Sequence, residues 1–183
     1  MLNIENSVLV IIDIQDRLVL ASKYGTEAAE NMTKLAKAAN ILSIPTVITE
    51  QYPKGLGNTV PMLKVAISPN AFVTEKSAFS AMMEPEFAQK IIELKNEGRN
   101  QILIGGIETH ICVLQTASDL IKEGFEVYIA KDTCASRKKD EYKTGIELLK
   151  QYGAKITCVE IVLFEWLKTS RHQNFKEVQA LIK

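Results

Sequence analysis

Short runs of apolar, mostly β-branched residues alternate along this chain with longer segments of helical periodicity. The runs show little alternation between polar and apolar positions, which is typical of strands that are covered on both faces. We expect six strands from these runs: Val8 to Ile14, Thr46 to Thr49, Ala71 to Thr74, Gln101 to Gly105, Glu126 to Ala130 and Lys155 to Thr157.

Four segments between these runs place apolar residues three and four positions apart, the spacing of an amphipathic helix: Met32 to Leu42, Glu84 to Glu97, Cys112 to Glu123 and Asp140 to Tyr152. The last two are followed by Gly124 and Gly153, and glycine commonly ends a helix. A repeated strand–helix order implies parallel strands joined by right-handed crossovers. The sequence therefore predicts a three-layer α/β/α fold with a six-stranded parallel sheet, of the Rossmann-like kind.

The chain has 183 residues, of which 46% are hydrophobic. No linker or change of composition divides it, so a single domain over residues 1–183 is expected. The stretch from Tyr52 to Pro69 lacks clear periodicity and is long for a loop in a compact domain. Loops of that length are often functional.

Charge and targeting signals narrow the classes of partner. The chain carries 22 basic and 22 acidic residues, which argues against nucleic acid or a membrane surface as the main partner. No window approaches the roughly 20 apolar residues of a membrane helix, and the first residues lack the basic run of a signal peptide.

Cys112, Cys134 and Cys158 are too widely spaced for a disulfide framework or a metal knuckle. The expected location is the reducing cytoplasm.

Three residues that could carry chemistry follow predicted strands. Asp13 lies at the end of the first strand, Lys76 follows the third, and Cys112 follows the fourth. Ligands of open parallel sheets bind beyond the carboxyl ends of the strands, where these three residues can converge.

Cys112 is the candidate nucleophile. With Thr109 as the N-cap, Cys112 falls in the first turn of a helix, where the dipole and a nearby Lys76 would lower the pKa of the thiol. Asp13 could then take the thiol proton and return it to a leaving group. The same spacing also fits a buried structural cysteine beside a structural pair of Asp13 and Lys76.

Three motifs extend this pattern: Ile11-Ile12-Asp13-Ile14-Gln15, Glu75-Lys76-Ser77-Ala78-Phe79 and Gly105 to Thr116. In order and spacing they resemble the isochorismatase-like cysteine hydrolases over nearly the whole chain. The segments Thr49 to Gly57 and Leu163 to Leu167 resemble a narrower subgroup, the isochorismatase-domain-containing proteins of bacteria and animal cells.

The resemblance implies roles for individual residues. Asp13 matches the general acid and base, Lys76 the lysine that stabilises the thiolate, and Cys112 the nucleophile. It also implies a cis peptide bond between Ile107 and Glu108, with an oxyanion hole formed by the backbone N–H groups of Glu108 and Cys112. Tyr52, Phe79 and His110 are expected near the substrate pocket.

Departures from the family pattern bear on metal and substrate. The nicotinamidase branch carries an Asp-x-His…His metal site after the second strand, whereas Glu50-Gln51-Tyr52 stands here, and no histidine precedes residue 110. We therefore expect no metal site of that kind and no cofactor. Because true isochorismatases lack the nucleophilic cysteine, Cys112 also argues against their vinyl-ether substrate.

The sequence thus predicts a cysteine-dependent hydrolase of a small amide or related C–N compound, working through a thioester. The alternative is a binding or regulatory protein that keeps the fold without turnover. The family resemblance and the apolar run Ile161 to Phe164 with Trp166 also predict a homo-oligomer.

Overall fold

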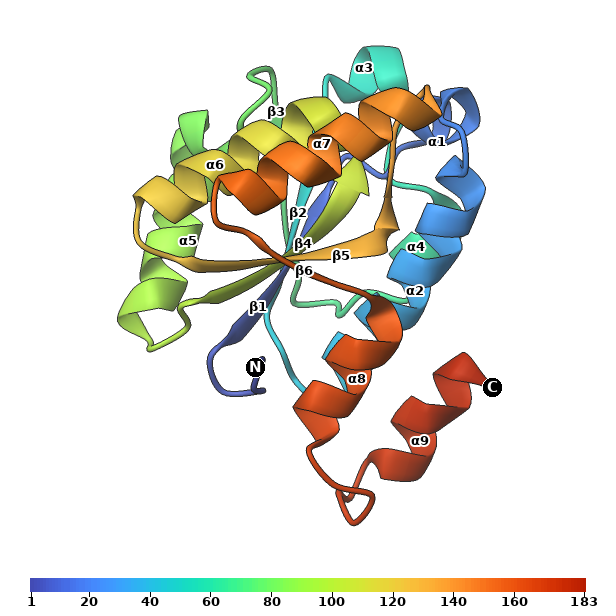
Figure 1. The fold of residues 1–183 in the computed structure, drawn as a ribbon, viewed down its shortest axis with the longest axis vertical. Helices are drawn as coiled ribbons and strands as arrows, with labels where there is room; N and C mark the ends of the chain where they lie inside the picture. The colour runs from blue at the N-terminus through green and yellow to red at the C-terminus, as the bar shows by residue number, and fades with distance from the viewer.

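The computed structural model describes residues 1–183 and contains one six-stranded sheet in the order β3-β2-β1-β4-β5-β6 (Figure 1). Every neighbouring pair of strands is parallel. The strands are β1 (Ser7–Ile12), β2 (Thr46–Gln51), β3 (Phe72–Lys76), β4 (Gln101–Ile107), β5 (Glu126–Ala135) and β6 (Lys155–Thr157). The predicted α/β/α architecture with a six-stranded parallel sheet is confirmed.

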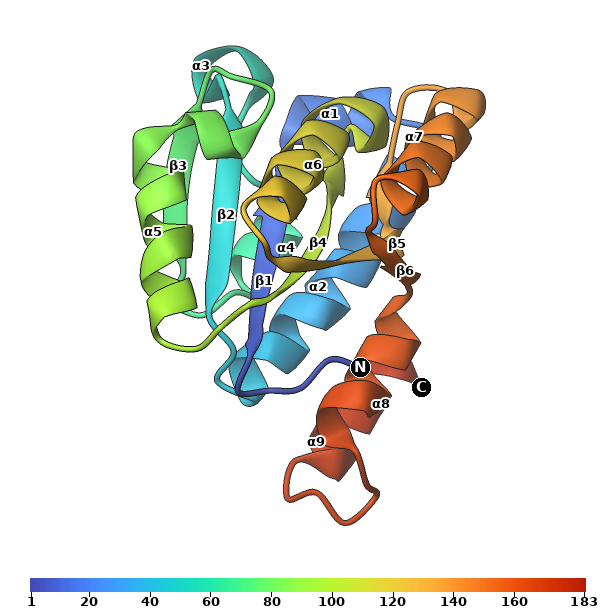
Figure 2. The same ribbon diagram turned by 60° about the vertical axis from the view of Figure 1, so that its left-hand side comes forward.

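Helices cover both faces of the sheet: Figure 1 shows the two helical layers on opposite sides of the strands, and Figure 2 turns strands β1, β2 and β3 toward the viewer. One face carries α5 (Pro85–Asn96), α6 (Leu114–Lys122) and α7 (Lys139–Gln151). The other carries α2 (Gly25–Ile41), α4 (Pro61–Lys64), α8 (Val159–Leu167) and α9 (Phe175–Gln179). Short α1 (Asp16–Ala21) and α3 (Pro53–Leu56) lie beyond the carboxyl ends of the strands, on the edge that carries the candidate site.

Strand β1 shows why the strand sequences are continuously apolar. Val8, Val10 and Ile12 pack with α5, α6 and α7, whereas Leu9 and Ile11 pack with α2 and α8. All five side chains are fully buried. A strand in the middle of three layers has no solvent face, so a polar residue in any of these positions would lose its hydration.

Several predicted boundaries differ from the structure. Strand β1 ends at Ile12, so Asp13 lies in the following loop, and β5 continues to Ala135, five residues past its predicted end. The register between β4 and β5 shifts between Ile104 and Gly106, which lets the polar stretch after Ala130 remain in the sheet. Polarity had marked that stretch as the end of the strand.

The stretch without clear periodicity, from Tyr52 to Pro69, also contains helices. Residues 52–69 hold α3 and α4, each a single turn that begins at a proline, the first helical position where proline is tolerated. At the C-terminus, Trp166 is 1% exposed, and its Nε1 donates to Ser7 Oγ at 3.0 Å. Trp166 therefore belongs to the core and not to an exposed apolar patch. No helix has the length and apolar character needed to cross a membrane.

Candidate active site

The direction in which the chain adds strands reverses between β1 and β4. From β1 the chain runs outward to β2 and β3, and from β4 it runs in the opposite direction to β5 and β6. Such a switch point is where open parallel sheets bind ligands, outside the carboxyl ends of the strands. Asp13 directly follows β1, and Cys112 lies in the π-helical turn Thr109–Val113 that follows β4.

Asp13 and Lys76 form a buried ion pair at this switch point of the sheet. Lys76 Nζ lies 2.8 Å from Asp13 Oδ2, and both side chains are 0% exposed. The other carboxylate oxygen, Oδ1, accepts a hydrogen bond of 2.6 Å from Thr49 Oγ1. The ammonium also donates to Gln51 Oε1 at 2.5 Å, and to the carbonyl oxygens of Ala78 and Phe79 at 3.2 and 3.3 Å. A charge pair this deeply buried persists only when its remaining donors and acceptors are used, as they are here.

Gln15 holds the loop that carries Asp13. Its Nε2 donates to the carbonyl oxygens of Gln51 and Gly57 at 3.0 and 2.6 Å, and its Oε1 accepts from Gln51 N–H at 2.7 Å. Asp13 has a φ of 51°, a left-handed conformation that is costly for a residue other than glycine. Two of these hydrogen bonds tie the strained loop to the end of β2, and the third ties it to Gly57 after α3.

Two residues that the sequence did not single out position Lys76. Gln51 accepts from its ammonium, as described above, and Glu84 fixes the loop that follows it by accepting N–H groups of Ser77 and Ala78 at 2.8 and 2.9 Å. The hydrogen bonds from Ala78 and Ser77 hold the pKa of Glu84 below its usual value. Glu84 directly precedes α5 but makes no cap bond to it, so no local sequence signal marked its contact with the upstream loop.

The environment of Cys112 raises its pKa instead of lowering it. The side chain is buried, with 7% exposure, and burial together with the negative charge of Asp13 raises the pKa of the thiol to about 12, against the opposing effect of Lys76. The helix starts where it was expected, because the π-helical turn begins at Thr109 and runs directly into α6 at Leu114, but Thr109 Oγ1 donates to Ala135 O at 2.9 Å instead of capping. The thiol is therefore protonated at neutral pH.

The pKa of Asp13 is also raised. Burial raises the pKa of its carboxyl above the ordinary value, although Lys76 and the hydrogen bond from Thr49 act in the opposite direction. A carboxylate of higher pKa is a stronger base, so the raised pKa of Asp13 offsets part of the cost that the raised pKa of Cys112 places on proton transfer from the thiol.

The backbone beside Cys112 offers a free donor. The peptide bond between Ile107 and Glu108 is cis. The N–H of Glu108 has no hydrogen-bond acceptor within the chain, while the Glu108 side chain accepts from Arg137 N and Nε at 2.9 and 3.1 Å. An N–H held in place without a partner is the kind of group that stabilises an oxyanion.

The three expected pocket residues differ in their surroundings. Tyr52 and Phe79 are 61% and 55% exposed, and their main chains contact Lys76: Tyr52 N–H donates to its carbonyl, and the Phe79 carbonyl accepts from its ammonium. His110 Nδ1 lies 3.1 Å from Ser136 Oγ, and its Nε2 lies 3.8 Å from Glu141 Oε2. Tyr52 and Phe79 thus mark the rim of the site, and His110 contacts the residue that follows β5 and a residue of α7.

One group of side chains could hold a metal ion. Donor atoms of Glu108, His110 and Glu141 lie within 4.8 Å of one another. Both carboxylates already have cationic partners, since Arg137 pairs with Glu108 and Lys138 lies 3.4 Å from Glu141. Glu50, the acidic residue after the second predicted strand, is also engaged, because its Oε1 accepts from Thr59 N and Oγ1 at 2.6 and 2.8 Å.

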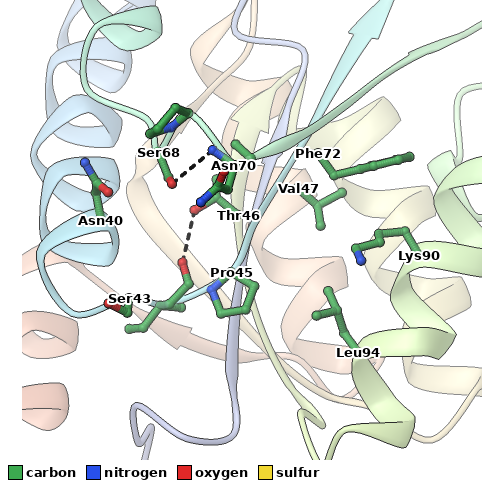
Figure 3. A pocket seen from close by; sticks show the side chains of 13 residues that line it. Asn40, Ser43, Pro45, Thr46, Val47, Ser68, Asn70, Phe72, Lys90 and Leu94 are labelled. Atoms are coloured by element: carbon green, nitrogen blue, oxygen red, sulfur yellow. Dashed lines mark hydrogen bonds between the residues drawn. The ribbon is translucent and has the colours of Figure 1, made fainter.

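A cavity of about 500 Å³ lies at the opposite edge of the sheet, beside the amino ends of β2 and β3 (Figure 3). Its polar side chains include Asn40, Ser43 and Asn70, and Asn70 N–H donates to Ser68 Oγ at 3.2 Å. Lys90, its one charged side chain, already pairs with Glu93 at 3.3 Å. This cavity is lined by no cysteine, histidine or carboxylate that could activate one of its hydroxyl groups.

Known proteins resemble this chain in sequence and in fold. The family model of the isochorismatase domain matches residues 7–161. Isochorismatase domain-containing protein 1 of Danio rerio is 38% identical over 97% of the chain, which spans 61% of that protein's length. The solved structure of the MAR1 ribonuclease from Caenorhabditis elegans has a TM-score of 0.92 and 37% identity, covering 99% of this chain and 91% of that one. The Escherichia coli YcaC gene product, described as an octameric hydrolase of unknown specificity, has a TM-score of 0.86 at 22% identity, covering 99% and 94%.

Proposed function

This chain belongs to the isochorismatase family, and we propose that it is a cysteine-dependent hydrolase of a small amide or a related C–N compound. The observation that carries the proposal is the buried pair of Asp13 and Lys76 next to the protonated thiol of Cys112, at the switch point of the sheet. A purely structural role would not require a base, a cation and a nucleophile together, with all three side chains buried.

The first step is attack by Cys112. The Asp13 carboxylate removes the thiol proton as the sulfur attacks the carbonyl carbon, so a free thiolate need not accumulate despite the high pKa of Cys112. The Lys76 ammonium offsets the negative charge that passes from Asp13 to the sulfur and then to the carbonyl oxygen. The oxyanion accepts hydrogen bonds from the N–H groups of Glu108 and Cys112.

Collapse of the tetrahedral intermediate breaks the C–N bond. Protonated Asp13 gives its proton to the departing nitrogen, which leaves as an amine or ammonia, and a thioester to Cys112 remains. Asp13 next removes a proton from water, which attacks the thioester carbon. The carboxylic acid leaves, and the sulfur regains its proton. The thiol supplies the nucleophile and Lys76 the positive charge, so this scheme uses neither a metal nor an organic cofactor.

Burial limits the size of the substrate. Cys112 is 7% exposed, and the side chains of Asp13 and Lys76 are inaccessible. The C. elegans relative is named a ribonuclease, but a polymer backbone cannot reach side chains at this depth, so RNA serves better as a negative control than as a candidate substrate.

The experiment is a panel of small primary amides assayed for ammonia release. Cys112→Ala should abolish release, whereas Cys134→Ala should retain it. Cys134 is a matched control, since it is also buried and its pKa is also raised to about 12. Hydroxylamine should capture the acyl group as a hydroxamate in the wild type only. Ammonia release that survives Cys112→Ala would refute the mechanism.

The alternative is a protein that binds small molecules without turnover. The high pKa of Cys112 favours it, because a buried and protonated thiol is inert on its own. Mass spectrometry of the intact protein after incubation with the amides separates the two functions. A covalent acyl adduct supports the hydrolase, and binding without any adduct or ammonia supports the alternative.

We also propose that the chain forms a homo-oligomer. Ile161 and Phe164 on α8 remain 51% and 42% exposed, although Trp166 of the same apolar run is buried. The E. coli relative described above is octameric, a property of that protein at 22% identity. Light scattering at micromolar concentration should give a mass well above the 20.4 kDa of one chain. A value near 20.4 kDa would refute the oligomer.

A further inference from the structure

We propose that a second site, separate from Asp13, Lys76 and Cys112, binds a small phosphate-bearing molecule. It is a cavity of about 380 Å³, called the lysine cavity below, at the junction of α2, β5 and α7. Its lining consists of residues 23, 24, 27 and 28 around the start of α2, residues 131, 132 and 134 of β5, and residues 139, 142 and 143 of α7.

Unpaired positive charge is the main feature of the lysine cavity. The ammonium groups of its four lysines have no carboxylate oxygen within 4.0 Å and donate no hydrogen bond: Lys23, Lys131, Lys139 and Lys143. Only two carboxylates line the cavity, Glu27 and Asp132, and both oxygens of Asp132 already accept the N–H of Val159 at the start of α8. The chain as a whole has equal numbers of acidic and basic residues, so this excess is local.

The backbone adds to the positive potential. Helix α2, of 17 residues, begins after Tyr24, and α7, of 13 residues, begins after Lys138. Neither helix has a side-chain cap; Gly25 N–H of α2 donates to Ser22 O at 3.1 Å, and the other N–H groups of both first turns have no acceptor within the chain. Two helix starts and four ammonium groups around one hollow suit a doubly charged anion better than a single carboxylate.

Two aromatic rings indicate what else the ligand carries. Tyr24 is 55% exposed, with Lys23 Nζ 5.5 Å from its ring centroid. The hydroxyl of Tyr142 donates to the carbonyl of Lys131 at 3.0 Å, which fixes that ring as part of the wall. Rings beside cations accept a flat organic group attached to the phosphate. A volume of about 380 Å³ is sufficient for such a molecule and larger than free phosphate requires.

The test is calorimetric titration with adenosine 5′-monophosphate at low salt, with adenosine and inorganic phosphate as separate arms. We expect the monophosphate to bind with a Kd below about 1 mM and adenosine not to bind. The double variant Lys139→Gln, Lys143→Gln should weaken binding at least about tenfold, because two of four cations are lost. Inorganic phosphate that binds and competes with the monophosphate would identify the phosphate group itself as the recognised part.

The matched control is Lys37→Gln, Lys150→Gln. These lysines lie on the same two helices away from the cavity, are exposed, and also have no carboxylate partner. The control should bind the monophosphate as the wild type does, and both doubles should keep the wild-type melting temperature. The proposal is overturned if neither phosphate compound binds, if both doubles lose affinity equally, or if only an RNA oligonucleotide binds.

Discussion

Lys76 and the lysines of the lysine cavity lie at the carboxyl edge of one sheet, but they differ in burial and in their contacts. Lys76 is inaccessible to solvent, and its ammonium contacts Asp13, Gln51 and two carbonyl oxygens. The lysines of the lysine cavity are exposed and contact no acceptor. A buried ammonium must be fully coordinated by the protein, which fixes its position, whereas an exposed one is left free for a ligand. Burial therefore separates a lysine suited to chemistry from lysines suited to binding.

The largest expected difference between the two regions concerns turnover. Cys112→Ala should lower kcat for an accepted amide by on the order of 10⁴-fold or more, because it removes the only group able to form the thioester. Lys143→Gln in the lysine cavity should leave kcat unchanged. The rate of ammonia release at saturating amide measures both variants. A Cys112→Ala protein within tenfold of the wild type would remove the distinction.

The next difference concerns stability. Lys76→Met leaves the Asp13 carboxylate buried without its cation and should lower the free energy of unfolding by about 3–5 kcal/mol at pH 8. Lys131→Met, a matched change at an exposed lysine, should alter it by less than about 0.5 kcal/mol. Urea denaturation followed by circular dichroism gives both values. Because protonation relieves the stranded carboxylate, the loss in Lys76→Met should be smaller at pH 5, and equal losses in the two variants would contradict the assigned burial.

The raised pKa of Cys112 predicts a smaller effect that depends on pH. The native thiol keeps its proton up to about pH 12, whereas the unfolded chain releases it near the ordinary value of 9.0. Stability should therefore fall as pH rises between these two values. At pH 10.5 the wild type should have lost about 2 kcal/mol more, relative to pH 8, than Cys112→Ala. Parallel urea titrations at the two pH values measure this, and identical losses would show that Cys112 is not shielded.

The smallest expected effect is that of metal removal. Glu108 and Glu141, the acidic members of the one group of potential metal ligands, already pair with Arg137 and Lys138. Dialysis against EDTA should therefore leave amide turnover unchanged. Activity that is lost on chelation and restored by zinc, manganese or magnesium would replace the metal-free mechanism with one that involves this group.

The fold was predictable because its signals are periodic. Apolar runs of β1, β2 and β4 and amphipathic segments of α5 and α7 recur in an order that parallel sheets require. Strand ends were harder to predict, since β5 stays in the sheet through Lys131 and Asp132, where the pairing with β4 shifts. Pairing between distant strands is a tertiary effect that a local pattern does not report.

The candidate site was predictable in its residues and not in its electrostatics. Asp13 and Lys76 were placed together from strand ends and motif order, and the structure joins them at 2.8 Å. The pKa of Cys112 is raised and not lowered as expected, because the direction of its shift depends on two facts that the sequence does not show. One is how deeply the thiol is buried, and the other is that the negative charge of Asp13 outweighs the opposing effect of Lys76. Gln51 escaped notice because its contact with Lys76 depends on the pairing of β2 with β3.

The strand order also determines when the site can exist during folding. Asp13 and Lys76 belong to the half of the sheet built from β1 to β3, whereas Cys112 and Glu108 follow β4, and 99 residues separate Asp13 from Cys112. The ion pair can form while the second half is still unfolded, but the nucleophile meets its base only when β4 docks on β1. Contacts so distant in sequence form slowly. Protection of Cys112 from alkylation during refolding therefore times the joining of the two halves.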